Sequence, residues 1–188
     1  MKVGVLALQG DFREHLKATE ALGHEASPIR RSSELDDVDA LILPGGESTT
    51  IALLAESYGL LQPISKKISE GYPVYGSCAG MILLADEIEG GVHGQQTFGG
   101  IDMTVRRNAF GRQIESFEEE IDFAGIRVNG VFIRAPWVER VGSSVEILAT
   151  HHNHPVAVRQ GHLLATSFHP ELTGDLSVHR YFFDEVAR

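Results

Sequence analysis

The sequence has one cysteine, few basic residues and no long apolar run. A lone cysteine cannot close an internal disulfide, so nothing points to an oxidising compartment. No stretch approaches the roughly 18 apolar residues of a membrane-spanning helix. Lysine and arginine number 16 against 26 aspartates and glutamates, which gives a formal net charge of −10. Because no basic face is available to neutralise phosphates, we expect neither a membrane nor a nucleic acid as partner.

The chain of 188 residues has the size and composition of one globular domain, predicted to span residues 1–188. We find no internal repeat, low-complexity tract or linker in it. The first residues combine a lysine with a short apolar run, but Gln9, Gly10 and Asp11 end that run too early for a secretory signal. We therefore expect a buried first strand here and a cytoplasmic protein.

The first half of the chain alternates short apolar runs with helical patterns. Residues 2–8 and 40–43 are typical of buried strands, and a helical pattern follows each of them. A third apolar run leads to Cys78, and the composition of residues 79–88 favours a helix directly after it. This alternation predicts a parallel sheet with helices on both faces.

Beyond about Gly90 the pattern changes to glycine-rich loops and strand-like runs. Five such runs are predicted to extend the sheet as antiparallel strands: residues 101–105, 128–135, 145–151, 154–160 and 163–168. The final segment places Leu176, Phe183 and Val186 on one helical face and is predicted to close the domain as a packed helix. The expected fold is α/β, with a mostly parallel sheet and an antiparallel extension.

Cys78 lies in the sequence GSCAG, between Gly76 and Gly80. This is the spacing of the strand–turn–helix elbow that exposes a nucleophile above a sheet. Glycine neighbours suit the strained backbone of such a turn, and the helix that follows directs its first amides at the site. A thiolate there is a strong nucleophile, and the amide of Ala79 is placed to donate to an oxyanion. The alternative is a buried cysteine that acts only as a small apolar side chain.

His169 is the best candidate for the base among nine histidines. It ends an apolar run, is followed by Pro170, and has Glu171 on the same side. Because the carboxyl ends of parallel strands meet at one edge of a sheet, we expect His169 and Glu171 to lie near Cys78. The three residues then form a candidate triad of nucleophile, base and orienting carboxylate. A capped strand end is the alternative for this segment.

The other histidines have simpler interpretations. Four are predicted to have surface or packing roles: His15, His24, His93 and His179. His151, His152 and His154 are close in sequence, but strand alternation points the first two to opposite faces, and no carboxylate or thiol stands nearby. A hairpin turn is therefore favoured over a metal site, and no metal is expected.

A glycine pair, Gly45 and Gly46, follows the strand predicted at residues 40–43. Glycine reaches backbone conformations closed to other residues, so the amide of Gly46 is predicted to complete an oxyanion hole with that of Ala79. Phosphate binding is disfavoured, because the segment lacks the lysine of a P-loop and the spacing of a dinucleotide loop.

Three stretches in this order, LPGGEST, GSCAG and FHPE, resemble those of the class I (triad) glutamine amidotransferases. More narrowly, GVLALQGDFREH, RNAFGRQ and GVFIRAP resemble the glutaminase subunits of two-component pyridoxal 5'-phosphate synthases, and the likeness covers essentially the whole chain. It implies a three-layer, flavodoxin-like fold and hydrolysis of L-glutamine to glutamate and ammonia through a cysteine thioester. It also implies a hetero-oligomer with the synthase subunit, which uses the ammonia to make pyridoxal 5'-phosphate (vitamin B6), and no cofactor in the glutaminase.

The resemblance also assigns six residues to glutamine binding: Gly46, Glu47, Ser48, Arg107, Ile133 and Arg134. Arginine suits this role, because its fixed pair of donors matches the carboxylate of a free amino acid. A solvated or partner-facing charge is the alternative for Arg107 and Arg134. The glycine-rich residues 89–100 carry no motif that assigns them a role.

The sequence leaves three other functions open. The chain can be the glutaminase subunit of another amidotransferase, a cysteine peptidase or glyoxalase-like enzyme of the same fold, or a catalytically silent regulatory subunit. The PGGEST loop and the carboxylate after His169 favour glutamine as substrate. The complete set of Cys78, His169 and Glu171 argues against a silent subunit.

Overall fold

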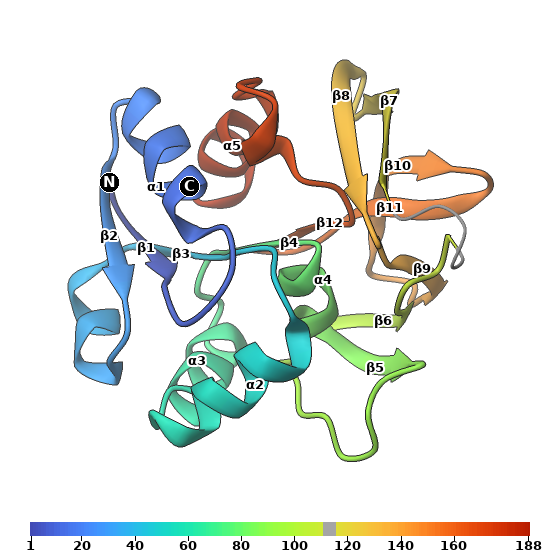
Figure 1. The fold of residues 1–188 in the computed structure, drawn as a ribbon. Coiled ribbons are helices and arrows are strands. Elements are labelled where there is room, and N and C mark those ends of the chain that lie inside the picture. The colour runs from blue at the N-terminus through green and yellow to red at the C-terminus, as the bar shows by residue number, and fades with distance from the viewer. Residues whose placement is uncertain (111–115) are drawn as a thin grey trace.

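The computed structural model describes residues 1–110 and 116–188. Seven strands form its central sheet: β1 (Lys2–Leu6), β2 (Glu25–Ile29), β3 (Ala40–Leu43), β4 (Val74–Ser77), β10 (Glu146–His151), β11 (His154–Gln160) and β12 (Leu163–Thr166). Their order is β10-β11-β12-β4-β3-β1-β2 (Figure 1). The five strands from β12 to β2 run parallel, and the order β2-β1-β3-β4-β12 is that of a flavodoxin-like sheet. The predicted fold class is confirmed.

Helices cover both faces of this sheet (Figure 1). They are α1 (Phe12–Ala21), α2 (Ser48–Ser57), α3 (Leu61–Ser69), α4 (Ala79–Leu84) and α5 (Ser177–Tyr181). Three short helical turns lie between β2 and β3, before α5 and after α5: η1 (Ser32–Asp37), η2 (Pro170–Leu172) and η3 (Phe182–Val186). The first apolar cluster includes residues of α2, α3 and α4, whereas α1 and α5 pack against the second. The molecule therefore has three layers, as the resemblance implied.

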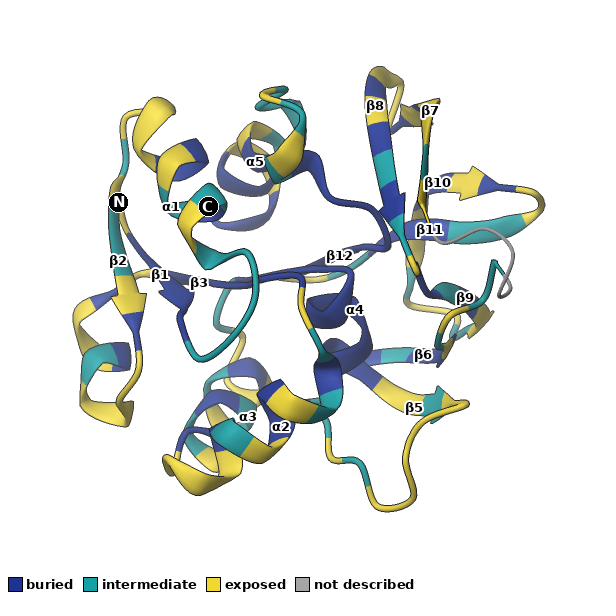
Figure 2. Ribbon diagram, in the orientation of Figure 1, coloured by how far each residue is buried: buried dark blue, intermediate teal, exposed yellow. Residues whose placement is uncertain are grey.

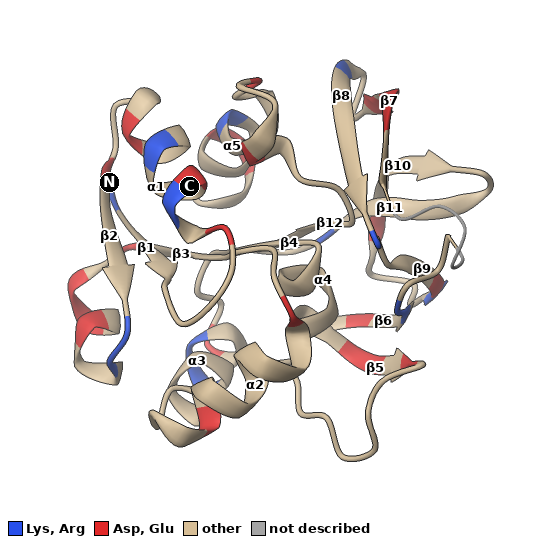
Figure 3. Cartoon of the chain, viewed as in Figure 1, with Lys and Arg blue, Asp and Glu red and all other residues tan. Residues whose placement is uncertain are grey.

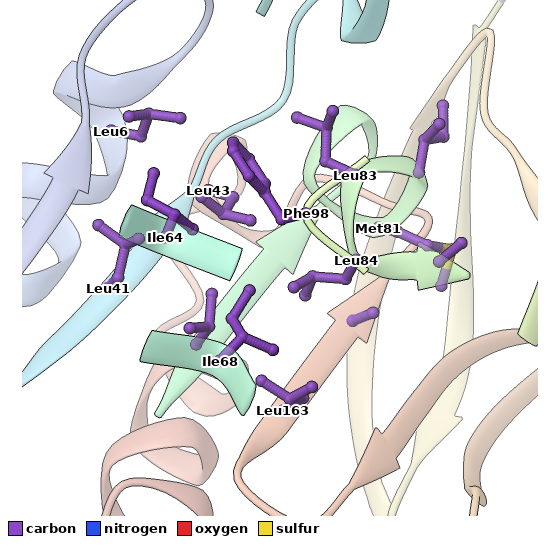
Figure 4. Close-up of a cluster of buried hydrophobic side chains, with 14 of the residues drawn as sticks. Leu6, Leu41, Leu43, Ile64, Ile68, Met81, Leu83, Leu84, Phe98 and Leu163 are labelled. Atoms are coloured by element: carbon purple, nitrogen blue, oxygen red, sulfur yellow. The ribbon is translucent and has the colours of Figure 1, made fainter. Parts of the chain in front are cut away.

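Alternation along the strands divides the core between the two faces. In β3, Leu41 and Leu43 point into the first cluster, and Ala40 and Ile42 into the second. Figure 4 shows the first cluster, where leucines of β3 meet side chains of α3 and α4. Strands β3 and β4 and helix α4 are buried at every position (Figure 2). This explains their nearly continuous apolar sequences.

Two smaller sheets lie beside the main one. One contains β5 (Ala85–Glu89), β6 (Ile101–Arg106) and β9 (Trp137–Val141), and the other contains β7 (Ser116–Phe123) and β8 (Ile126–Ile133). Acidic residues of β5 and β7 place much of the negative charge here (Figure 3). None of the helices in the described ranges is long and apolar enough to cross a membrane.

Some predictions for this half are wrong. Helix α4 ends at Leu84 instead of continuing to residue 88, because β5 pairs in parallel with β6 and this pairing overrides the helical composition. The runs at 101–105 and 128–135 do not extend the main sheet but belong to the two smaller sheets. Strands β10 and β11 do extend it in antiparallel fashion, whereas β12 returns parallel to β4.

The histidine-rich segment forms the predicted hairpin. His151 of β10 pairs with His154 of β11, and the two residues between them, His152 and Asn153, have φ angles of 47° and 65°. Such angles build the tight turn that suits the twist of two antiparallel strands. The final segment is also helical as predicted, as α5 and η3.

Candidate active site

Four loops meet at the carboxyl edge of the parallel sheet. They follow β1, β3, β4 and β12, which are four consecutive strands of the sheet. Strands β4 and β12 are paired so that Ser77 lies opposite Thr166. Cys78 follows the first of these residues, and His169 comes three residues after the second. The register of two strands therefore brings together segments about 90 residues apart, as the strand-end argument predicted.

Cys78 occupies a strained turn between β4 and α4. Its φ and ψ angles are 47° and −97°, and its amide donates to the carbonyl of Thr166 at 2.7 Å. The flanking glycines are needed for a different reason, close packing. A Cβ on Gly76 would lie 2.5 Å from the carbonyl of Gly80, and a Cβ on Gly80 would overlap the carbonyl of Leu43. The predicted elbow is confirmed, with its strain on the cysteine itself.

His169 and Glu171 form a buried pair. The distance from His169 Nδ1 to Glu171 Oε1 is 2.8 Å, and the carboxylate has no exposed surface. Burial lowers the pKa of His169, whereas the neighbouring side chains of Cys78 and Glu171 raise it, and the balance is a pKa of about 11. Burial raises the pKa of Glu171, but His15 and His169 outweigh this and hold it well below its ordinary range. The pair is therefore an imidazolium and a carboxylate at neutral pH.

Asp11 is an acidic neighbour that the sequence analysis missed. Its Oδ2 lies 3.7 Å from His169 Nδ1, and burial is the main cause of its raised pKa. Donor atoms of Asp11, His169 and Glu171 lie within 4.8 Å of one another, a spacing that a metal ion can bridge. However, Nδ1 of the protonated His169 already donates to Glu171, so a metal would have to displace that proton.

The loop after β3 packs against His169. A Cβ on Gly45 would lie 2.8 Å from Nδ1 of His169 and closer still to Cε1, so only glycine leaves room for the imidazole. Gly46 lies against Gln9 of the loop after β1, and the amide of Glu47 donates to Gln9 Oε1 at 2.8 Å. The loops after β1 and β3 are thus in direct contact with each other beside His169.

Glu47 and Arg107, two predicted glutamine-binding residues, form an ion pair. Arg107 Nη2 lies 2.9 Å from Glu47 Oε1, and Nη1 donates to Thr49 Oγ1 and Gln95 Oε1. Burial raises the pKa of Glu47, but hydrogen bonds from Thr50 and Thr49 at the start of α2 outweigh it and lower the pKa to about 2. Glu47 is therefore a carboxylate at neutral pH.

Residues 89–100, to which the sequence assigned no role, reach this ion pair through Gln95. Its Nε2 donates to Ser48 Oγ at 3.0 Å, while its Oε1 accepts from Arg107 at 2.9 Å. Gln96 instead bonds to Glu56 on α2. The glycine-rich composition of this segment gave no sign of either contact.

Ile133 and Arg134 follow one another at the end of β8, near Cys78. The carbonyl of Ile133, at the end of β8, is 4.0 Å from Cys78 Sγ. Arg134 is exposed and has a φ of 44°, so it is a second residue in a strained backbone conformation near Cys78. Residues 111–113 of the RNAFGRQ motif lie outside the described part of the chain.

The prediction for His15 and His179 missed their connection to the site. Packing was one of the roles predicted, and both are fully buried, but they lie directly behind Glu171. The sequence does hold a sign of this for His15. It fits the helical spacing of Phe12, Thr19 and Leu22 as well as Leu16 does, so a histidine occupies the inner face of α1.

The sheet order and the cysteine elbow define the fold class of glutamine amidotransferases, and comparison with known proteins agrees. The chain belongs to the SNO glutamine amidotransferase family, whose model matches residues 5–188. A crystal structure of a glutamine amidotransferase with 52% sequence identity superposes with a TM-score of 0.93 and covers 98% of both chains. PurLQS from Thermotoga maritima, at 16% identity and a TM-score of 0.68, shares the fold.

Curated relatives carry a more particular name. The chain is 62% identical over 186 residues to pyridoxal 5'-phosphate synthase subunit PdxT of Mycolicibacterium vanbaalenii, covering 96% of this chain and 95% of the relative. It is 61% identical over 187 residues to the protein of the same name from Streptomyces coelicolor, covering 98% and 93%.

Proposed function

We propose that this chain is the glutaminase subunit of a pyridoxal 5'-phosphate synthase, acting as one domain over residues 1–188 in the cytoplasm. The observation that carries the catalytic assignment is the strained Cys78 elbow beside the buried His169–Glu171 pair. Family membership and relatives of one name along nearly the whole chain support the choice of glutamine and of the partner synthase.

Attack by the Cys78 thiolate on the side-chain amide carbon of glutamine opens the reaction. The amide of Ala79 is the first of α4 and has no acceptor within the helix, so it is available to the developing oxyanion together with the amide of Gly46. Protonated His169 gives its proton to the departing ammonia, which leaves a glutamyl thioester on the sulfur. The imidazole, now neutral, takes a proton from water, and attack by that water releases glutamate.

The six predicted binding residues are assigned to holding glutamine beside Cys78. Arg107 and Glu47 offer opposite charges to the carboxylate and ammonium of glutamine, and Ser48 lies beside them, held by Gln95. The carbonyl of Ile133 lies 4.0 Å from the sulfur, and Arg134 follows it in the chain. Ammonia released to solvent would be lost to synthesis, so a docked synthase subunit has to receive it.

Replacement of the only cysteine tests the assignment. Cys78→Ala, purified with the synthase subunit, should lose glutamate release by about 10⁴-fold or more while still binding that subunit. His169→Asn should be nearly as severe and Glu171→Ala milder. Ser167→Ala is a matched control, because Ser167 lies two residues before His169 and its buried hydroxyl has no hydrogen-bond partner among the described residues.

Each outcome separates the proposal from its rivals. Glutamate release by Cys78→Ala at the unmodified rate contradicts the mechanism. Cleavage of a peptide or a 2-oxoaldehyde in place of glutamine, lost with Cys78, favours the peptidase or glyoxalase-like alternative. A complex without any Cys78-dependent release of glutamate favours a silent subunit.

A further inference from the structure

Behind the triad carboxylate lies a buried polar cluster that the mechanism above does not use. It consists of His15 on α1, Ser77 on β4 and His179 on α5, each with no exposed surface. His15 Nε2 lies 3.0 Å from Ser77 Oγ and 3.4 Å from Glu171 Oε1, while His15 Nδ1 lies 2.9 Å from His179 Nε2. Helices α1 and α5 lie on the same face of the sheet (Figure 1), and this cluster joins them to Glu171.

The proton positions follow from the environment of His179. Burial and the nearby His15 lower its pKa to about 3, so His179 is neutral. Its Nδ1 is buried and has no hydrogen-bond partner in the described residues. A buried N–H without an acceptor is costly, so the hydrogen is on Nε2, which donates to His15 Nδ1. His15 therefore carries its own hydrogen on Nε2, which is hydrogen-bonded to Ser77 Oγ at 3.0 Å and lies beside Glu171 Oε1 at 3.4 Å.

Glu171 needs such a donor. Its Oε1 faces two N–H groups, those of His169 and His15, whereas its Oε2 has no hydrogen-bond partner among the residues described. The other titratable groups around it are poor substitutes. Asp11 is itself a carboxylate, and the hydroxyl of Tyr75 bonds to Thr166.

We propose that His15 is a positioning residue for glutamine hydrolysis, whose Nε2–H holds the Glu171 carboxylate toward His169 while His179 fixes the ring of His15 from α5. His15 acts through Glu171 and does not touch the substrate. The inference rests on the proposed function, because it assigns His169 and Glu171 their roles in the triad.

Two substitutions isolate the Nε2 donor. In His15→Gln the side-chain amide nitrogen reaches the position of Nε2, whereas in His15→Asn the shorter amide reaches only that of Nδ1. We expect His15→Asn in the complex with the synthase subunit to lower kcat roughly 10- to 100-fold at a nearly unchanged KM, as loss of an orienting partner does. His15→Gln should recover most of that loss.

A spectroscopic measurement separates positioning from general structural damage. The proton shared by His169 Nδ1 and Glu171 should give a far-downfield NMR resonance, assigned by its absence in His169→Asn. It should persist in His15→Gln and weaken or move upfield in His15→Asn, with the fold checked by thermal unfolding. His24→Leu is the matched control, since His24 follows α1 and packs on Phe183.

An unchanged resonance and unchanged kcat in a folded His15→Asn overturn the inference. If His15→Asn does not fold, the deciding variant is His179→Asn, whose side chain is too short to reach His15, with His179→Gln and His15→Gln as the conservative variants beside it. A kcat and a resonance in folded His179→Asn equal to those of His24→Leu then also overturn the inference. Failure of the proposed function is distinguishable, because the unmodified complex would then show no Cys78-dependent release of glutamate, whatever the His15 variants do.

Discussion

The contact between Gly45 and the imidazole of His169 gives a sharp test of how closely the active site is packed. Gly45→Ala adds one methyl group, which would lie 2.8 Å from Nδ1 and closer still to Cε1, where ordinary contact begins at 3.4 Å. Because His169 is 3% exposed, the ring has little free space and must shift by roughly 1 Å. A displacement of that size at a reacting group typically costs about 100-fold in rate, or ~2.7 kcal/mol in the activation free energy.

The assay is glutamate release by the complex with the synthase subunit, with thermal unfolding measured on the same samples. Gly45 does not have a positive φ angle, so the added methyl group should leave the backbone unstrained. Gly125→Ala is the control with strain but no steric overlap, since Gly125 has a φ of 81° and open space around it. That variant should lose about 1 kcal/mol of stability and keep its activity.

Full activity in a folded Gly45→Ala would contradict this prediction. It would mean that the imidazole has room to move without loss of the proton transfers assigned to it. A fall in activity matched by an equal fall in stability would also count against it, because the expected effect is on kcat.

The remaining predictions concern pH and substrate binding. Because the pKa of His169 is raised from 6.5 to about 11, its stabilising effect is complete below pH 6.5 and is lost as the pH rises through 11. In urea unfolding, His169→Asn should therefore cost less free energy at about pH 10 than at about pH 6, and an equal cost at both contradicts the assignment. The pKa of Glu171 is lowered from 4.5, so the sign is reversed, and Glu171→Gln should destabilise fully above pH 4.5 and less as the pH falls below it. Gln95→Leu should raise the KM for glutamine roughly tenfold with little change in kcat, because it removes a hydrogen bond to charged Arg107 worth about 1.5 kcal/mol. Gln96→Leu is its control, and an equal KM in the two variants would exclude a role for Gln95 in binding.

Features encoded in short, local patterns could be predicted from the sequence. The elbow at Cys78 needs only a strand, two glycines and a helix start in succession, and the strand end at His169 is marked by a proline. The parallel sheet followed from alternating apolar runs. These signals do not depend on knowing which elements are neighbours in space.

The rest depends on contacts between distant segments. The end of α4 at Leu84 is set by pairing of the next residues with β6, which the helical composition of that segment conceals. The link between His15 and Glu171 exists only because α1 packs near the strand end after β12. Gln95 reaches Ser48 from a segment without regular structure, so periodicity gave no information about it.

The pairing of β4 with β12 also bears on how the protein folds. The pairing brings Cys78 and His169 together by closing a loop of about 90 residues. Closing so large a loop has an entropic cost that pairing of strands close in sequence does not have. Antiparallel pairs of consecutive strands, such as β10–β11 and β11–β12, form without this cost. We therefore expect β12 to pair with β4 late, after it has paired with β11. A chain still emerging from the ribosome thus has Cys78 before it has His169, and glutamine is not consumed until the segment from β10 to η2 has been made.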